Sequence, residues 1–135
     1  MLVPFTMVYA VYILCLGEFS PGGGFQAGAL LSVGVLLARL ILGFDTKFNV
    51  LGKTSVVLAG VGTFIYALTG WLTLLGGADF FLNYNYMPIR MEAQNEMHAT
   101  GIFLIEIGVA ICVMMTIINL LDAIVKRGEE HGRTE

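Results

Sequence analysis

Long uninterrupted apolar runs, separated by short polar stretches, dominate the pattern along the chain. A helix that crosses a bilayer needs about 20 mostly apolar residues, because lipid offers no hydrogen-bond partners to an open backbone. The runs are continuous rather than alternating, which argues against a transmembrane β-barrel. The pattern therefore predicts an all-α integral membrane protein with four transmembrane helices, at about residues 1–17, 23–44, 54–77 and 98–125.

The first apolar segment is the shortest of the four. Residues 1–17 reach only about 25 Å as a helix, less than the ~30 Å hydrocarbon core. The segment lacks the basic start and the small-residue cleavage site of a signal peptide. Pro4 lies in its first turn, where proline is tolerated. We therefore expect a true first transmembrane helix.

Composition narrows the class of protein further. Of 135 residues, 57% are hydrophobic and only 13% are charged, whereas a soluble domain is about 25% charged. Two cysteines exclude a disulfide scaffold, and seven basic against ten acidic residues make nucleic-acid binding an unsuitable function. We expect residues 1–135 to form a single four-helix transmembrane domain that ends in a short charged tail at 126–135.

The distribution of basic residues predicts the orientation. With four spans, the N-terminus, the 45–53 loop and the C-terminal tail share one side of the membrane. Six of the seven basic residues belong to that side or can reach it, and only Arg90 lies on the other. This is the positive-inside pattern. The sequence thus predicts an antiparallel bundle in the plasma membrane, with both termini in the cytoplasm.

Small residues at helical spacing mark faces where membrane helices pack closely. The second segment carries Gly24, Gly28 and Ser32 on one face. The third carries a stripe of small residues and the fourth a glycine pair, namely Gly60, Thr63, Ala67, Gly70 and Gly77, and Gly101 and Gly108. We hypothesise that some of these faces contact other subunits. The alternative is that they only close the four-helix bundle.

Few residues offer chemistry. The chain has no phosphate-binding loop and no nucleophile motif, and its few cysteines and histidines cannot form a metal or haem site. Cys15 and Cys112 lie within apolar runs, where buried packing thiols are expected. We therefore predict no cofactor and no metal, and a protein that is not by itself an enzyme.

Glu106 is the outstanding residue, because Ile105 and Ile107 flank it inside the fourth apolar segment. A carboxylate at such depth is costly and rarely faces lipid. Two interpretations stay open: a structural hydrogen bond to another helix or subunit, or a place in or beside an ion path. His98 lies eight residues earlier, about 12 Å along a helix. It suits either a polar boundary or a water-mediated relay to Glu106.

Two polar residues, Asn119 and Asp122, lie at the inner end of the fourth segment. They suit a helix cap or contact with a partner loop. Because Lys126 follows closely, the favoured interpretation of Asp122 is a surface ion pair with that lysine.

The turn between the first two segments reads Ser20-Pro21-Gly22-Gly23-Gly24-Phe25-Gln26-Ala27-Gly28. Proline stiffens the turn, and the glycines permit close approaches that other residues do not. One interpretation is a tight hairpin packed under a neighbour. The other is a helix N-terminus whose bare amides hold an anion or water.

These motifs resemble the MnhB/MrpB family, the small subunits of multi-subunit Na⁺/H⁺ antiporters of the Mrp type. The likeness rests on the Pro21–Gly28 stretch after Glu18-Phe19-Ser20, on Leu75-Gly76-Gly77, and on His98-Ala99-Thr100-Gly101-Ile102 with Glu106-Ile107-Gly108-Val109. It covers nearly the whole chain. The same subunit type also occurs in redox-driven membrane complexes such as energy-converting hydrogenases and related sulfur reductases.

The resemblance implies an accessory subunit of a cation/proton antiporter module, with Na⁺ and H⁺ as its ions and other membrane subunits as partners. Hydrogenase-type redox subunits would be partners only in the redox-driven setting. Glu106 would be the titratable group of an ion path and His98 an outer group where protons enter. The interface motif would be Pro21, Gly22, Gly23, Gly24, Phe25 and Gly28. A stand-alone homo-oligomeric transporter or channel and a purely structural assembly subunit remain as alternatives.

Overall fold

The computed structural model describes residues 1–17, 23–43, 53–77 and 94–134, and almost all of them are helical. The all-α prediction is therefore confirmed over this part of the chain. The helices are α1 (Leu2–Cys15), α2 (Gly23–Leu42), α3 (Lys53–Leu75) and α4 (Gln94–Gly132).

The helix lengths depart from the sequence prediction at the two ends of the chain. With 14 residues, or about 21 Å, α1 is shorter than a hydrocarbon core. By contrast, α4 has 39 residues and continues to Gly132, well past the predicted end at 125. Lys, Arg and Glu are good helix formers, so the polar tail extends the helix instead of ending it. Three helices, α2, α3 and the part of α4 from His98, are long and apolar enough to cross a membrane.

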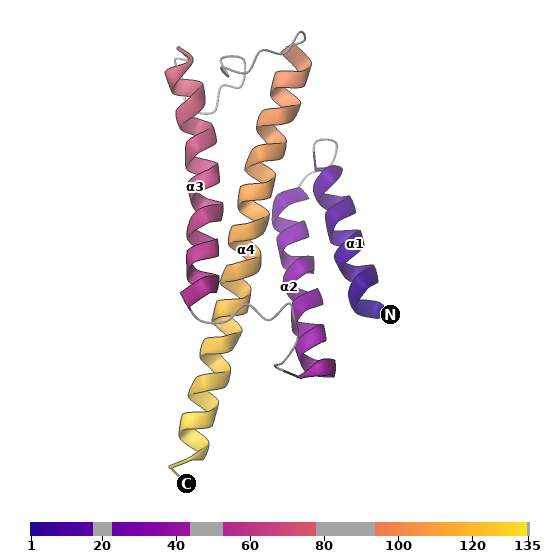
Figure 1. The fold of residues 1–135 in the computed structure, drawn as a ribbon, viewed down its shortest axis with the longest axis vertical. Helices are drawn as coiled ribbons and strands as arrows, with labels where there is room; N and C mark the ends of the chain where they lie inside the picture. Colours follow the sequence, from indigo (N-terminus) through magenta and orange to yellow (C-terminus); the bar gives the residue numbers. More distant parts are fainter. Residues whose placement is uncertain (18–22, 44–52, 78–93, 135) are drawn as a thin grey trace.

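The helices lie side by side in an open row rather than a closed bundle (Figure 1). In this row α4 packs against α3 on one side and α2 on the other, while α1 packs mainly against α2. Among the described residues, α3 contacts neither α1 nor α2. Each consecutive pair is antiparallel, but the contact that joins the two pairs is between α2 and α4, which run in the same direction (Figure 1).

The α1–α2 pair is shifted along the helix axes relative to the α3–α4 pair. Gly24 of α2 contacts Glu106 of α4, which lies 12 residues after Gln94. At 1.5 Å per residue this is about 18 Å below the start of α4. Figure 1 shows the end of α1 and the start of α2 well below the upper ends of α3 and α4. A side chain from the middle of α4 therefore lies level with the ends of two other helices.

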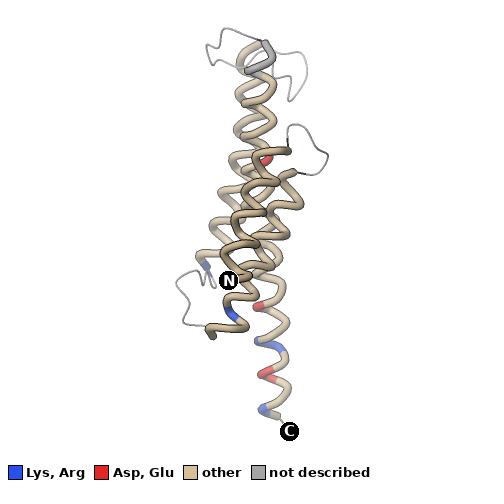
Figure 2. Tube along the Cα trace, turned by 90° about the vertical axis from the view of Figure 1, so that its right-hand side faces the viewer, with Lys and Arg blue, Asp and Glu red and all other residues tan. Residues whose placement is uncertain are grey.

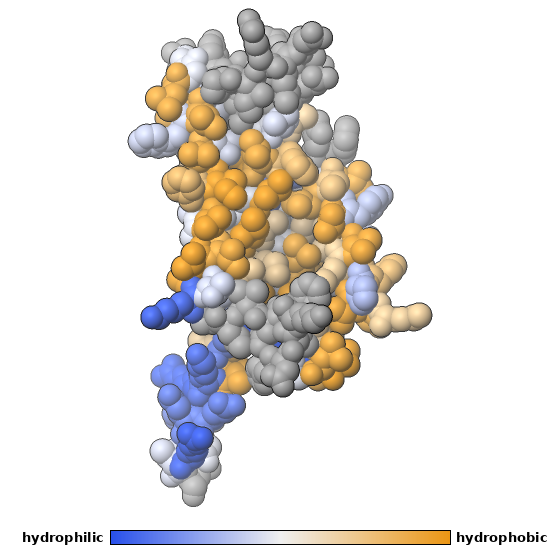
Figure 3. Space-filling view, viewed as in Figure 1, coloured by the Kyte–Doolittle hydropathy of each residue, from blue (hydrophilic) through white to orange (hydrophobic). Residues whose placement is uncertain are grey.

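Six serine and threonine hydroxyls within the helices are satisfied by the backbone of their own helix. Four threonines donate to the carbonyl four residues earlier, and Ser32 and Thr73 to the one three residues earlier; the threonines are Thr6, Thr63, Thr69 and Thr116. Such bonds remove the cost of a hydroxyl in an apolar setting. The visible face over the helices is mostly hydrophobic, and charges gather at the C-terminal end of α4 (Figures 2 and 3). This surface suits lipid and partner helices.

Candidate functional site

The carboxylate of Glu106 lies where α1 ends and α2 begins. A Cβ atom built on Gly17 would collide with this carboxylate, and one on Gly23 would lie 2.9 Å from its Oε1. The Glu106 Oε2 atom is buried. Both neighbouring residues lack side chains, so the carboxylate occupies space that any larger residue would fill. Glu106 is thus partly buried, with its carboxylate directed toward the end of α1 and the start of α2.

Glycines in the first turns of α2 make this placement possible, because they let α2 approach α4 at backbone distance. A Cβ on Gly24 would lie 2.7 Å from the carbonyl oxygen of Glu106, and one on Gly28 only 2.6 Å from that of Ala110. Both distances are shorter than any tolerable contact with an added carbon atom. The spacing of four residues puts the two glycines on one helix face. The α2–α4 contact therefore depends on glycine at both positions.

The position of Glu106 has an electrostatic consequence. The first four backbone N–H groups of a helix lack partners within the helix, and the macrodipole makes this end partly positive. Gly23 and Gly24 begin α2, and both lie against Glu106. A negative carboxylate is favoured at such a place. Glu106 therefore both fills the contact and complements the charge of the α2 N-terminus, at a depth where charge is otherwise costly.

The other predicted site residues are distributed around this contact. Phe25 follows the glycines but points outward, with 61% of its surface exposed. His98 is half-buried within α4 and is separated from Glu106 by eight residues, about 12 Å of helix. Pro21 and Gly22 lie outside the described residues. The structure thus brings Glu106 together with the glycines, and not with His98.

A second polar contact, which the sequence pattern did not predict, lies at the inner end of the α2–α4 interface. Arg39 Nη1 of α2 donates to Asp122 Oδ1 of α4 at 2.7 Å, and both side chains are largely buried. The favoured pairing of Asp122 with Lys126 is therefore wrong. From the sequence, Arg39 was expected only to reach toward the membrane surface. Charged residues within membrane segments usually pair with each other, and this rule was the signal that could have found the contact.

The same end of the molecule also joins α3 to α4. The Ser55 hydroxyl donates a hydrogen bond to Asn119 Oδ1, across 64 residues of sequence. Ser55 is fully buried. Asn119 therefore does not cap α4, which continues to Gly132, and its side chain bonds to α3 instead. Together with the Arg39–Asp122 pair, this bond ties three helices together at one level.

Small residues on α3 separate into two faces. Gly62 is buried against α4, where an added Cβ would lie 2.6 Å from the Gly108 carbonyl oxygen. Gly60 and Ala67, from the predicted stripe, are not buried, and an added Cβ on Gly60 would contact nothing within 4 Å. The predicted stripe therefore does not form the α4 contact at these two positions. Other members of the stripe do lie on the inner side, since Gly70 is buried and the Thr63 hydroxyl lies 3.4 Å from Cys112 Sγ of α4.

Comparison with known proteins agrees with this arrangement of motifs. The profile of the MnhB family, described as a domain related to the MnhB subunit of Na⁺/H⁺ antiporters, matches residues 1–119. The chain belongs to the MnhB family. The resemblance predicted from the glycine-rich turn and the Glu106 region is thereby confirmed.

Two curated relatives of this MnhB-family chain are both named as the B-type subunit of a Na⁺/H⁺ antiporter. One, from Bacillus subtilis (strain 168), is 25% identical over 117 residues, which are 82% of either chain. The other, from Alkalihalophilus pseudofirmus, is 29% identical over 119 residues, which are 82% of this chain and 81% of the relative. No solved structure gives a significant match. The family is one of transporter subunits rather than enzymes, and this chain is a multi-pass membrane protein.

The cysteines of this MnhB-family member are both free thiols. Cys15 is exposed, so the expectation that it is a buried packing thiol is wrong, because α1 lies at the edge of the row. Cys112 is half-buried, with its Sγ 3.4 Å from the Thr63 hydroxyl. Within the described ranges, no three His, Cys, Asp or Glu side chains come together as metal ligands.

Proposed function

We propose that the chain is an accessory membrane subunit of a multi-subunit Na⁺ (cation)/H⁺ antiporter of the Mrp type. Membership of the MnhB family and the names of its relatives support this assignment. The structural observation that carries it is the placement of Glu106, an ionisable group held at the junction of three helices. The chain supplies this group to a larger assembly and packs against neighbouring subunits.

We propose that all four helices cross the plasma membrane, with both termini in the cytoplasm. The N-terminus of α1 and the C-terminus of α4 lie at the lower ends of their helices, as an even number of crossings requires (Figure 1). The Lys and Arg residues of the described chain gather at that end (Figure 2), which agrees with the positive-inside rule. Accessibility of single cysteines introduced near each terminus tests the topology. Labelling of either terminus from outside intact cells would contradict it.

The role proposed for Glu106 is that of an intramembrane titratable group within or beside an ion path. Its carboxylate lies against Gly17 and Gly23, at the end of α1 and the start of α2, and its Oε2 atom is buried. His98, nearer the outer end of α4, is proposed as a group where protons enter, connected to Glu106 through water. This role rests on the proposed membership in an antiporter.

Other membrane subunits are proposed to cover the two edges of the row. Large apolar side chains of α1 and α3 are exposed along these edges, among them Phe5, Tyr9, Phe64 and Trp71. The exposed small-residue face at Gly60 permits the close approach of another helix. Phe25 points outward beside the glycine-rich turn and is proposed to anchor the partner on that side, together with Pro21 and Gly22.

Isolation of the intact assembly tests the proposed function. The chain is tagged at its C-terminal tail and purified in a mild detergent, and the proteins that come with it are identified by mass spectrometry. Several large antiporter-like membrane subunits are expected. Iron–sulfur subunits of the hydrogenase type among them would assign the redox-driven setting, and their absence would assign a free-standing antiporter. Recovery of the chain alone, or only with copies of itself, would contradict the proposal.

The strongest competing function is a purely structural assembly subunit, and the close α2–α4 contact at Glu106 favours it. In that case, Glu106→Gln preserves ion transport, since the amide has the same shape as the carboxyl. A stand-alone homo-oligomeric transporter is a further candidate, and it predicts transport by vesicles that contain this chain alone. The antiporter-subunit proposal predicts no transport by the isolated chain.

A further inference from the structure

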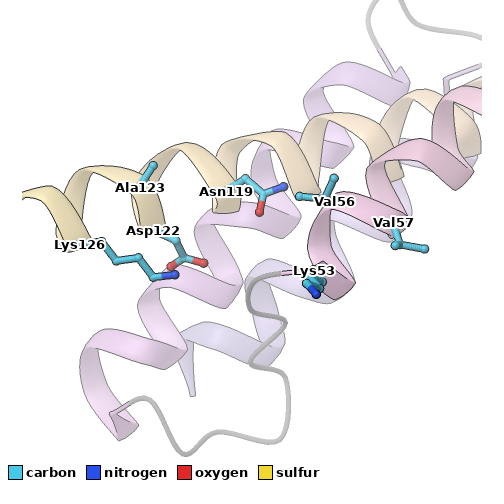
Figure 4. A pocket seen from close by; sticks show the side chains of 7 residues that line it. All are labelled: Lys53, Val56, Val57, Asn119, Asp122, Ala123 and Lys126. Carbon is cyan, nitrogen blue, oxygen red and sulfur yellow. The ribbon is translucent and has the colours of Figure 1, made fainter.

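A pocket of about 550 Å³ opens between the start of α3 and the inner part of α4. Figure 4 shows the side chains that line it, with Lys53, Val56 and Val57 on α3 and Asn119, Asp122 and Lys126 on α4. The lining joins two basic groups with an apolar wall. We propose that this pocket binds the headgroup of an acidic phospholipid from the cytoplasmic leaflet.

The charges around the pocket favour an anion. Arg39 neutralises Asp122, since their side chains form an ion pair at 2.7 Å. Lys53 and Lys126 both line the pocket, and within the described part of the chain neither forms an ion pair with a carboxylate. The remaining local charge of these four side chains is therefore about two positive units. An anionic phosphate in this pocket is attracted by both ammonium groups, and each can donate charge-assisted hydrogen bonds.

The apolar wall distinguishes a lipid from a free anion. Val56 and Val57 are 61% and 63% exposed and continue the hydrophobic surface of α3. An acyl chain that runs along this surface buries apolar area, and this burial adds to the attraction that the charges provide. Inorganic phosphate has no part that could use these valines. The pocket therefore combines the two features that a phospholipid carries in one molecule.

The level of the pocket in the membrane also fits a headgroup. Lys53 begins α3, the second of the three helices that are long and apolar enough to cross the bilayer. Lys126 lies where the apolar sequence of α4 passes into its charged end. Both ammonium groups thus lie at the boundary between apolar and polar surface, where phosphate groups of lipids lie. Only the assignment to the cytoplasmic leaflet rests on the proposed topology.

The test uses the intact complex, reconstituted in nanodiscs of phosphatidylethanolamine with a minor share of phosphatidylglycerol. After extraction in mild detergent, native mass spectrometry counts the phosphatidylglycerol molecules that stay bound. Each basic residue near a membrane surface contributes about 1 kcal/mol to the attraction of an acidic lipid, which is about fivefold in affinity. Lys53→Gln and Lys126→Gln should each weaken retention by about that factor, and the double variant should lose about one phosphatidylglycerol per complex.

Arg127→Gln is the matched control, because it removes the same charge from the neighbouring position but does not line the pocket. It should retain the lipid. Ala123→Trp fills the pocket without changing its charge and should expel the lipid. Equal retention in the wild type and the double variant would overturn the proposal, as would an equal loss in Arg127→Gln. If inorganic phosphate binds the wild type but not the double variant, while lipid retention is equal in both, the site holds a free anion and the lipid proposal is wrong.

Discussion

The two ends of the α2–α4 interface hold charged side chains in different surroundings. At the inner end, Arg39 and Asp122 form an ion pair in which each side chain compensates the other. At the outer end, the Glu106 carboxylate lies against Gly17 and Gly23, and the backbone of Glu106 lies against Gly24. One interface thus carries a fixed pair of opposite charges and an acidic group set against helix ends.

The difference between the two contacts indicates different roles, one in the stability of the chain and the other in its proposed ion path. A buried ion pair keeps both charges under ordinary conditions, because loss of either one leaves the other buried and uncompensated. A carboxylate at a helix N-terminus meets the partial positive charges of backbone N–H groups, which favour its negative form. We therefore assign the inner contact to the stability of the chain. For the outer contact we propose a change of protonation during transport.

The largest effect on stability is expected when one member of the inner pair is removed. Arg39→Met leaves Asp122 charged inside the α2–α4 interface, which costs about 3–5 kcal/mol in comparable buried pairs. The yield of intact complex and its resistance to thermal unfolding should both fall sharply. These quantities are measured by size-exclusion chromatography after stepwise heating.

The double variant Arg39→Met/Asp122→Leu is the control for this prediction. It replaces both charges with apolar groups, so most of the lost stability should return. An Arg39→Met variant as stable as the wild type would show that the inner pair does not hold the interface.

The next largest effect is expected from the glycines at the outer end. Gly24→Leu places a side chain 2.7 Å from the carbonyl oxygen of Glu106, so α2 must move away from α4. Overpacking of this kind costs about 1–3 kcal/mol. Proteolysis of α2 in the purified complex should become faster. Gly128→Leu, at a position with nothing within 4 Å, should leave the cleavage rate unchanged, and equal behaviour of the two variants would argue against the close contact.

The smallest effect on the chain itself is expected at the outward face of α3. Gly60→Leu adds a side chain where this chain has no atom within 4 Å, so its own fold should change by less than about 0.5 kcal/mol. Its effect should instead appear as a weaker association with a neighbouring subunit, measured by co-purification. Gly62→Leu, on the buried face, should disrupt the chain. Undiminished co-purification of Gly60→Leu would show that no helix packs closely there.

Much of the fold could be predicted because the thickness of the bilayer sets the length of the apolar run that a spanning helix needs. Continuous apolar runs predicted α2 at 23–44 and α3 at 54–77, close to the observed Gly23–Leu42 and Lys53–Leu75. The ends of α4 were harder to predict, since polar residues with good helix propensity extend a helix beyond the apolar run. The arrangement of the helices in an open row could not be predicted either, because a small-residue stripe identifies a contact face but not the helix that packs against it.

The candidate site was predictable in part for the same reason. Glu106 and the glycines stood out singly, one as a charge in an apolar run and the others as a rare sequence. Their contact joins residues more than 80 positions apart, which periodicity does not reveal. The Arg39–Asp122 pair spans 83 positions, and the closer Lys126 offered a misleading local partner. Pairing of charges at equal depth in two membrane segments was the better guide.

The role proposed for Glu106 requires its charge, and not only its shape, in the function of an antiporter. The most direct measurement is cation-driven proton movement in vesicles that contain the purified complex with Glu106→Gln. The glutamine keeps the packing against Gly17 and Gly23 but cannot exchange a proton. Glu106→Asp, which keeps the ionisable group, is the matched control.

We expect both variants to assemble with a full set of subunits. Transport should fall to background in Glu106→Gln and stay measurable in Glu106→Asp. Assembled Glu106→Gln complexes that transport at the wild-type rate would contradict a role of the Glu106 charge in transport and leave Glu106 with a purely structural role.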